Sequence, residues 1–169
     1  MRTWRLLLLS MSFLCFWNVD AFPVRGADVY QGTVLDRETG EPLADAVLVV
    51  IWWTAPYVRM DGPRYFHDAK ETLTDANGKF SLDTTPKSNW NPFYFIESRP
   101  TIIIYKPGYR PLTGSTALAL GFRTDVAEAL SKGVVVELPK LKPKDDVRKY
   151  VSLASLDANV PRESIPNLV

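Results

Sequence analysis

The stretch Gly32–Val49, GTVLDRETGEPLADAVLV, constrains the fold more than any other part of the chain, because it predicts a strand, a turn and a second strand in succession. The residues around its start alternate in the manner of a β-strand, with one set of side chains on each face. One face holds Tyr30, Gly32 and Val34, and the other holds Val29, Gln31 and Thr33. The pattern predicts a strand that ends near Asp36.

The segment that follows, Arg37–Pro42, favours a chain reversal. Gly40 can adopt a positive φ and Pro42 fixes its own φ, so both residues suit a turn. Ala46–Ile51, with the sequence AVLVVI, then begins a second strand. Its β-branched valines favour a pleated sheet over a helix, and its apolar run is long enough for burial on both faces.

Three further segments predict strands downstream. Glu71–Leu82 contains Asn77-Gly78 between two short runs, which is a strong hairpin signal. Thr101–Tyr105 is rich in isoleucine and is followed by Pro107-Gly108, which ends it. Gly133–Leu138 predicts a late strand that closes the sheet. The chain is therefore expected to be all-β.

Three motifs stand in the order G-x-V-x-D-x-x-T-G-E-P-L-x-x-A at Gly32–Ala46, TDANGKFSL at Thr74–Leu82 and KPGY at Lys106–Tyr109. In this order they resemble the carboxypeptidase regulatory-like domain family, and together they span most of residues 28–139. The resemblance implies a seven-stranded Greek-key prealbumin-like (transthyretin-like) β-sandwich, placed at residues 27–139. It also implies a non-catalytic, extracytoplasmic module that binds proteins or carbohydrates.

Two stretches, 52–70 and 86–100, depart from the compact motif pattern and are interpreted as inserted loops that hold much of the aromatic content. Loops on a rigid scaffold often carry binding residues, so their rings are the candidate binding residues, with packing over the sandwich edge as the alternative. The adjacent Trp52 and Trp53 point to opposite faces of an extended chain, which predicts that one of them lies outside the core. The candidates are Trp52, Trp53, Tyr57, Tyr65, Trp90, Phe93 and Tyr94.

The first 21 residues have the pattern of a signal peptide. Arg2 and Arg5 precede the apolar run Leu6–Trp17, which is too short to span a bilayer comfortably, and Val19–Ala21 offers small residues for cleavage. Cys15, the only cysteine, lies in the segment expected to be removed, so the mature chain would contain no disulfide. The expected location is periplasmic or secreted, with a retained membrane anchor as the alternative.

Charge gives no sign of a nucleic-acid partner. Cleavage after residue 21 removes two of the 20 basic and one of the 19 acidic residues, which leaves 18 of each. Residues 140–169 form a basic, helical C-terminal extension in which Val147, Tyr150, Val151 and Ala154 share a helix face, followed by a tail from Asp157 that is expected to be poorly ordered. A second short helix is predicted over Asp125–Lys132, with Asp125 and Glu128 as a capping box and Gly133 at its end.

Few residues in the chain are suited to catalysis or metal binding. His67 is the only histidine, whereas a catalytic zinc usually takes three protein ligands, and the hydroxyisourate hydrolases of the prealbumin-like fold use several histidines. Asp75-x-Asn77-Gly78 matches the start of a calcium loop, yet Phe80 and Leu82 stand where further oxygen ligands would be required. No catalytic residue, metal site or cofactor is expected.

Two functions are compatible with these patterns. The preferred one is a non-catalytic exported binding module that docks on an envelope or secreted protein through its aromatic loops. The alternative is a carbohydrate-binding module that stacks sugars on Trp52 or Trp53, Trp90 and Tyr94. A small hydrolase based on His67 is a distant third.

Overall fold

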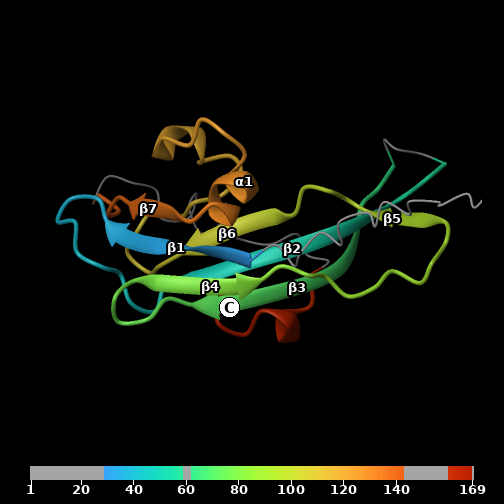
Figure 1. The fold of residues 1–169 in the computed structure, drawn as a ribbon, viewed down its shortest axis with the longest axis horizontal. Helices are drawn as coiled ribbons and strands as arrows, with labels where there is room; N and C mark the ends of the chain where they lie inside the picture. Colours follow the sequence, from blue (N-terminus) through green and yellow to red (C-terminus); the bar gives the residue numbers. More distant parts are fainter. Residues whose placement is uncertain (1–28, 59–61, 143–159, 169) are drawn as a thin grey trace, which may run out of the picture.

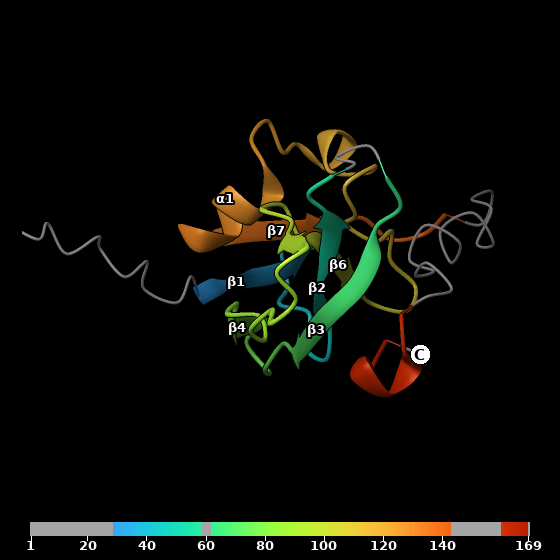
Figure 2. The ribbon, with the colours of Figure 1, turned by 90° about the vertical axis from the view of Figure 1, so that its right-hand side faces the viewer.

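The computed structural model describes residues 29–58, 62–142 and 160–168, in which seven strands form two sheets packed face to face (Figure 1; Figure 2). The three-stranded sheet has the order β4-β1-β7, with β4 at Lys79–Asp83, β1 at Val29–Asp36 and β7 at Val134–Leu138. In the four-stranded sheet, β2 (Val47–Pro56) pairs on one edge with β3 (Tyr65–Leu73) and on the other with β6 (Thr101–Tyr105) and β5 (Tyr94–Ile96). The chain is mostly β, and two sheets make a sandwich.

The main core lies between the sheets and is built from alternate residues of each strand. Leu48, Val50 and Trp52 point inward from β2, and they meet side chains of β1, β4, β6 and β7. Ile102 and Ile104 of β6 lie beside them in the same sheet, and the residues opposite, in the three-stranded sheet, include Tyr30, Val34, Phe80, Val136 and Leu138. Burial of these apolar side chains is the principal force that holds the two sheets together.

The outer face of the four-stranded sheet is also buried, which explains the unbroken apolar sequence of β2. Its outward residues Val47, Val49, Ile51 and Trp53 pack with Ile103 of β6 and with Val160, Ile165 and Leu168 from the C-terminal segment. Backbone and side-chain groups of Asn167 donate hydrogen bonds to the Glu71 carboxylate of β3. The expectation of a poorly ordered tail is therefore wrong for residues 160–168, because these apolar residues cover a sheet face.

The interpretation of residues 52–70 as an inserted loop is wrong. β2 continues through both tryptophans to Pro56, and β3 begins at Tyr65, so the connection between them is short. The ladder is interrupted once: Trp52 faces Asp68 and Trp53 faces Phe66, which leaves His67 as the extra residue of a β-bulge. The aromatic composition of this stretch reflects a long, twisted hairpin.

The Asn77-Gly78 turn is present, but the strands on either side of it do not pair. Gly78 has φ +69°, and the Asp75 carboxylate accepts hydrogen bonds from the Asn77 and Lys79 amides. β4 pairs with β1 in the other sheet, so the turn carries the chain across the sandwich. This pairing requires a glycine opposite Phe80, because a Cβ on Gly32 would come within 2.9 Å of the phenyl ring.

The remaining elements agree with the local patterns. α1 spans Val126–Ser131 beside β1, Asp125 accepts a hydrogen bond from the Ala127 amide at its start, and Gly133 with φ +76° follows its end. Glu128 does not complete a capping box; its carboxylate pairs with Lys132 instead. Two 3₁₀ turns lie at Leu118–Leu120 and Arg162–Ser164. The predicted signal peptide at 1–21 and the predicted C-terminal helix around 147–154 fall on residues outside the described ones.

Candidate functional site: an aromatic tip

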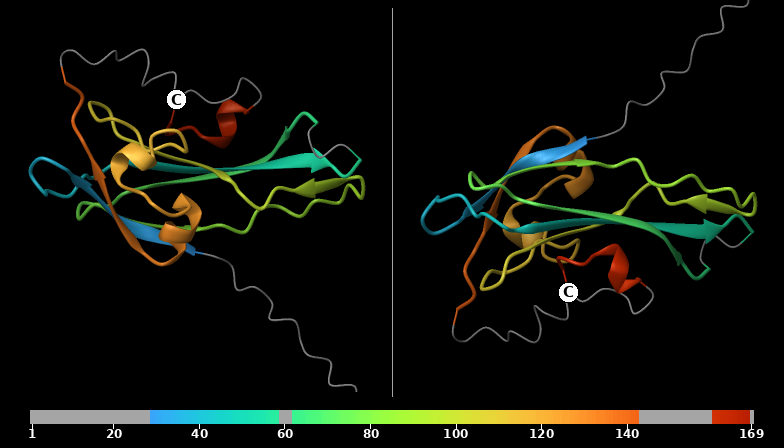
Figure 3. Two further views of the ribbon diagram at one scale, coloured as in Figure 1. Left: turned by 90° about the horizontal axis from the view of Figure 1, so that it is seen from above. Right: turned by 90° about the horizontal axis from the view of Figure 1, so that it is seen from below.

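One end of the four-stranded sheet forms a narrow ribbon that reaches beyond the three-stranded sheet (Figure 3). It consists of the end of β2, the start of β3 and the short β5. Thr54 stands between Tyr65 of β3 and Ile96 of β5, and Pro56 pairs with Tyr94. Within 86–100, the second stretch interpreted as an inserted loop, β5 is therefore a strand that widens this ribbon.

Aromatic rings occupy both faces and the end of this ribbon. The rings of Tyr57 and Phe95 lie 5.2 Å apart, and those of Tyr65 and Tyr94 lie 5.7 Å apart in an edge-to-face contact. Since β2 alternates its faces and paired residues share one, these two ring pairs lie on opposite sides. We call the following residues the aromatic tip: Tyr57, Val58, Tyr65, Trp90, Phe93, Tyr94 and Phe95.

The most exposed members of the aromatic tip are at its end. Trp90 is 90% exposed, Val58 is 89% exposed and Phe93 is 70% exposed, whereas Tyr57 and Tyr65 lie partly against their ring partners. Large apolar side chains that gather at one exposed place are uncommon on a soluble protein without an interaction there. The tip is a projecting surface that presents several rings at once.

Asparagine side chains fix the loop that carries Trp90 and Phe93. Asn89 donates from its amide to the Tyr94 carbonyl at 2.7 Å and accepts from the Asn91 amide, and Asn91 in turn accepts from the Phe93 amide at 3.0 Å. The Phe93 carbonyl then accepts from the Tyr57 amide, which ties this loop to the end of β2. The exposed rings therefore stand on a defined backbone.

A second set of contacts fastens the start of this loop to the edge of β3. Asp68 is 3% exposed; its carboxylate accepts from the Lys87 amide at 3.0 Å and lies 3.3 Å from the Lys87 ammonium. The Nε2 atom of His67, freed from the ladder by the bulge, lies 2.7 Å from the Lys87 carbonyl. The only histidine of the chain thus makes an ordinary structural contact.

Both strand tryptophans belong to the core, so the prediction that one of them lies outside it is wrong. Trp52 is 5% exposed between the sheets, and Trp53 is 3% exposed beneath the C-terminal segment. The Trp53 indole donates to the Thr101 hydroxyl at 2.9 Å, and the Arg64 guanidinium sits 5.1 Å from its ring centre. Neither ring offers a face to a ligand, whereas the other five candidates all lie in the aromatic tip.

A pocket of about 350 Å³ opens at the base of the aromatic tip, where β5 leads into β6. Two arginines line it: Arg64 pairs with Glu97 at 3.3 Å, and Arg99 lies 3.9 Å from Asp125. The Asp125 carboxylate also lines the pocket, and the remaining wall combines apolar side chains with two threonines. The candidate site therefore combines exposed rings at the end of the ribbon with a pocket at its base.

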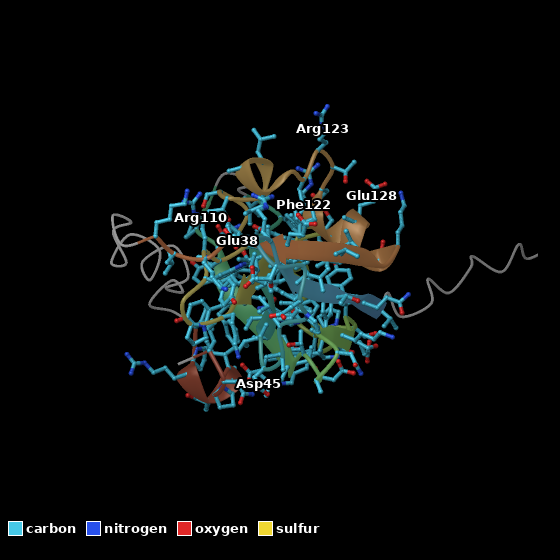
Figure 4. All side chains as sticks on the ribbon, turned by 90° about the vertical axis from the view of Figure 1, so that its left-hand side faces the viewer. Glu38, Asp45, Arg110, Phe122, Arg123 and Glu128 are labelled. Carbon is cyan, nitrogen blue, oxygen red and sulfur yellow. The ribbon has the colours of Figure 1, made fainter. Side chains whose placement is uncertain are left out.

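A buried carboxylate holds the opposite end of the sandwich together (Figure 4, where Glu38 and Arg110 mark this end). Asp36 is 3% exposed; it accepts from the Tyr109 hydroxyl at 2.9 Å and lies 2.8 Å from the Lys140 ammonium. The Lys140 hydrogen bond, with help from Tyr109 and two backbone amides, holds the pKa of Asp36 far below its usual range. Burial and the Asp36 carboxylate raise the pKa of Tyr109. Asp36 and Tyr109 thus join two of the three motifs.

Within the described residues, no group of three or more histidine, cysteine, aspartate or glutamate side chains is placed to hold a metal ion. The carboxylate of Asp75, the first residue of the calcium-like spacing, is already bonded to the amides of its own turn. No helix in the same residues is long and apolar enough to cross a membrane.

Comparison with known proteins provides little further information. No family model matches the chain, and no curated protein matches it. Among solved structures, a single-residue mutant of catechol 1,2-dioxygenase from Acinetobacter radioresistens is similar over 70% of this chain and 53% of that chain, with 22% identity and a TM-score of 0.36. The chain spans about half the length of that enzyme. A likeness at this level identifies neither a family nor a reaction.

Proposed function

We propose that this protein is an exported, non-catalytic binding module that docks on an envelope or secreted protein through its aromatic tip. The observation that carries the proposal is the group of exposed rings on a backbone fixed by side-chain hydrogen bonds. Aromatic residues dominate the hot spots of protein interfaces, because each buries a large area with few rotatable bonds. Order in the free protein also lowers the entropic cost of binding.

The shape of the tip favours a protein over a glycan. A flat platform for sugars would need several ring faces exposed on one side, whereas Tyr57 and Tyr65 stand on opposite sides of the ribbon and each packs against a neighbouring ring. Trp90 and Phe93 are exposed at the end of the ribbon. Aromatic side chains in such positions can fill pockets on a partner protein. A carbohydrate-binding module is the alternative, and its platform would have to be built around Trp90 and Tyr94.

The fold proposal is a carboxypeptidase regulatory-like domain of the prealbumin-like, seven-stranded Greek-key class. Its support is that the chain crosses between the sheets after β1, β3, β4 and β6, and that β7 returns to lie parallel to β1. The contact between Asp36 and Tyr109, which connects two motifs of the resemblance, agrees with this proposal. The proposed periplasmic or secreted location is supported by the signal-peptide pattern of residues 1–21.

The absence of catalysis is likewise a proposal. His67 contacts a backbone carbonyl on the loop that it helps to fasten, which is a sufficient role for it. If the protein were a small hydrolase that used this imidazole, His67→Ala would abolish its cellular effect. A non-catalytic module predicts that the variant retains its effect.

Site-specific photo-cross-linking in the native envelope tests the docking proposal. A photoreactive phenylalanine analogue at Phe93 should yield one discrete protein adduct, and the additional Trp90→Ala substitution should abolish it. The same analogue at Val135, which is 54% exposed on the three-stranded sheet, is the matched control and should yield no such adduct. Equal adducts from both positions, or none from either, would refute docking through the tip. In that case a glycan panel read by tryptophan fluorescence tests the alternative.

A further inference from the structure

The pocket at the base of the aromatic tip is lined in part by residues that directly adjoin the strands of the tip. Arg64 directly precedes Tyr65, the first residue of β3, and Glu97 directly follows Ile96, the last residue of β5. The Glu97 amide also donates to the Trp53 carbonyl at 2.9 Å, which fixes this corner of the ribbon. The pocket therefore adjoins the aromatic tip at the start of β3 and the end of β5.

The guanidinium of Arg64 is held in place on two sides. Its carbon lies 5.1 Å from the centre of the Trp53 ring, and its Nη1 atom lies 3.3 Å from a Glu97 oxygen. A guanidinium carries five N–H donors, so bonding to Glu97 leaves others for a further acceptor. An arginine positioned in this way loses little side-chain entropy when it binds a carboxylate.

Arg99 is held much less firmly. Its side chain is 87% exposed, and its contact with Asp125 is 3.9 Å long. Exposed ion pairs of this length contribute little to stability, because water screens them and both side chains retain their motion. Arg99 can therefore exchange its contact with Asp125 for a contact with an incoming anion at small cost.

The rest of the pocket suits a short side chain and not a large ligand. Ile102, Ala117 and Val126 provide apolar wall, and Thr101 and Thr124 are its polar members beside the Asp125 carboxylate, which an incoming acidic group would replace as the partner of Arg99. The volume of about 350 Å³ lies at the small end of the range for binding pockets. A residue with an apolar stem and a carboxylate at its end matches this combination.

We propose that the pocket receives an acidic side chain of the protein that docks on the tip, with Arg64 and Arg99 as its two cationic contacts. This inference rests on the proposed docking function. The tip supplies apolar burial, and the two arginines set the register of the partner by accepting a negative charge only at this point. A partner with a neutral residue at that position binds less tightly.

Titration with blocked peptides, followed by NMR of the mature chain, tests the acidic-side-chain assignment. The probe is acetyl-Leu-Glu-Leu-amide, and its matched control is acetyl-Leu-Gln-Leu-amide. The glutamate peptide should shift the Gly114 and Thr124 amides and bind about tenfold more tightly than the control, since charge-assisted hydrogen bonds are the stronger ones. Equal affinity for both peptides, or shifts elsewhere, would overturn the inference.

Variants separate this inference from the docking proposal. Arg64→Gln with Arg99→Gln should abolish the preference for glutamate and weaken the Phe93 cross-link, whereas Arg162→Gln on the C-terminal segment should change neither. Trp90→Ala should abolish the cross-link and leave peptide binding intact. If the double arginine variant gives the same Phe93 cross-link as wild type, the docking proposal stands and the acidic-side-chain inference is refuted. If no position in the tip gives a cross-link even in the wild type, both are refuted.

Discussion

Replacing the two kinds of tryptophan should separate stability from binding. Trp53 and Trp90 differ in exposure, at 3% and 90%. Trp53→Ala removes a ring packed against Phe66 and Ile165, together with the hydrogen bond to Thr101. Trp90→Ala removes a side chain that is almost entirely in water. Trp53→Ala should therefore lower the stability of the fold, whereas Trp90→Ala should weaken binding and leave stability nearly unchanged.

The magnitudes follow from burial. Truncation of a buried tryptophan to alanine costs about 3–5 kcal/mol, which is a large part of the roughly 5–15 kcal/mol that stabilises a typical domain. Surface substitutions usually stay within about 0.5 kcal/mol. For a domain of this size Trp53→Ala should lower Tm by roughly 10–20 °C, and Trp90→Ala should leave Tm almost unchanged. Loss of a central interface ring, in contrast, costs about 2 kcal/mol or more of binding free energy.

Urea unfolding followed by far-UV circular dichroism measures the stability of both variants without using tryptophan as the reporter. Trp53→Phe is the control for ring burial and should fall between wild type and Trp53→Ala. A cost below about 1 kcal/mol for Trp53→Ala would show that the outer sheet face is not packed as described. A cost above about 2 kcal/mol for Trp90→Ala would show that its ring is buried in solution.

Three further predictions concern the framework. Thr74→Val should destabilise the fold by about 1–3 kcal/mol for each buried group left unbonded, because the Thr74 hydroxyl donates to the Leu43 carbonyl and accepts from the Ala46 amide. Urea unfolding measures this loss, and the control Thr74→Ser should retain most of the stability. Gly78→Ala should cost about 1–3 kcal/mol, since φ is +69° and a Cβ would lie 2.4 Å from a backbone oxygen; an unchanged unfolding midpoint would contradict this. Folding lowers the pKa of Asp36, so its stabilising contribution is complete above the unfolded value of about 4 and is lost as pH falls toward the folded value. Thermal unfolding at pH 5 and at pH 2.5 should show a steeper acid loss for wild type than for Asp36→Asn.

Local patterns were sufficient for elements whose ends are determined by nearby residues. β6 and β7 lie where the isoleucine and valine runs predicted them, and α1 begins at the Asp125 cap and ends before Gly133. In each case a glycine or a capping side chain stands at or near one boundary of the element. Such signals do not depend on the rest of the fold.

Long-range pairing could not be predicted from the same patterns. The Asn77-Gly78 turn indicates a hairpin, but β4 pairs with β1, where Gly32 leaves space for the Phe80 ring. Likewise, Trp52 is buried between the sheets, but burial of Trp53 on the other face depends on a C-terminal segment more than 100 residues away. Neither of these long-range contacts can be predicted from the local alternation of apolar and polar residues.

For the candidate site, the composition located the aromatic tip but not its support. Tyr57, Tyr65, Trp90, Phe93 and Tyr94 were candidates because aromatic residues gather in two stretches of the chain. The asparagines that hold the loop, Asn89 and Asn91, were missed, although asparagine at this spacing is typical of side-chain turns. Arg64 and Arg99 were missed because only the fold brings them to one pocket.

The parallel pairing of β1 with β7 has a consequence for how the molecule folds. Gly32 lies beside Val134, so the central strand of the three-stranded sheet waits for a neighbour about 100 residues later in the chain. Its other neighbour, β4, is also distant, whereas β2 and β3 pair locally through a short connection. Chains dominated by such distant pairings fold slowly. The β2–β3 hairpin, which carries part of the aromatic tip, can therefore form early, while the three-stranded sheet closes only after the last strand has emerged.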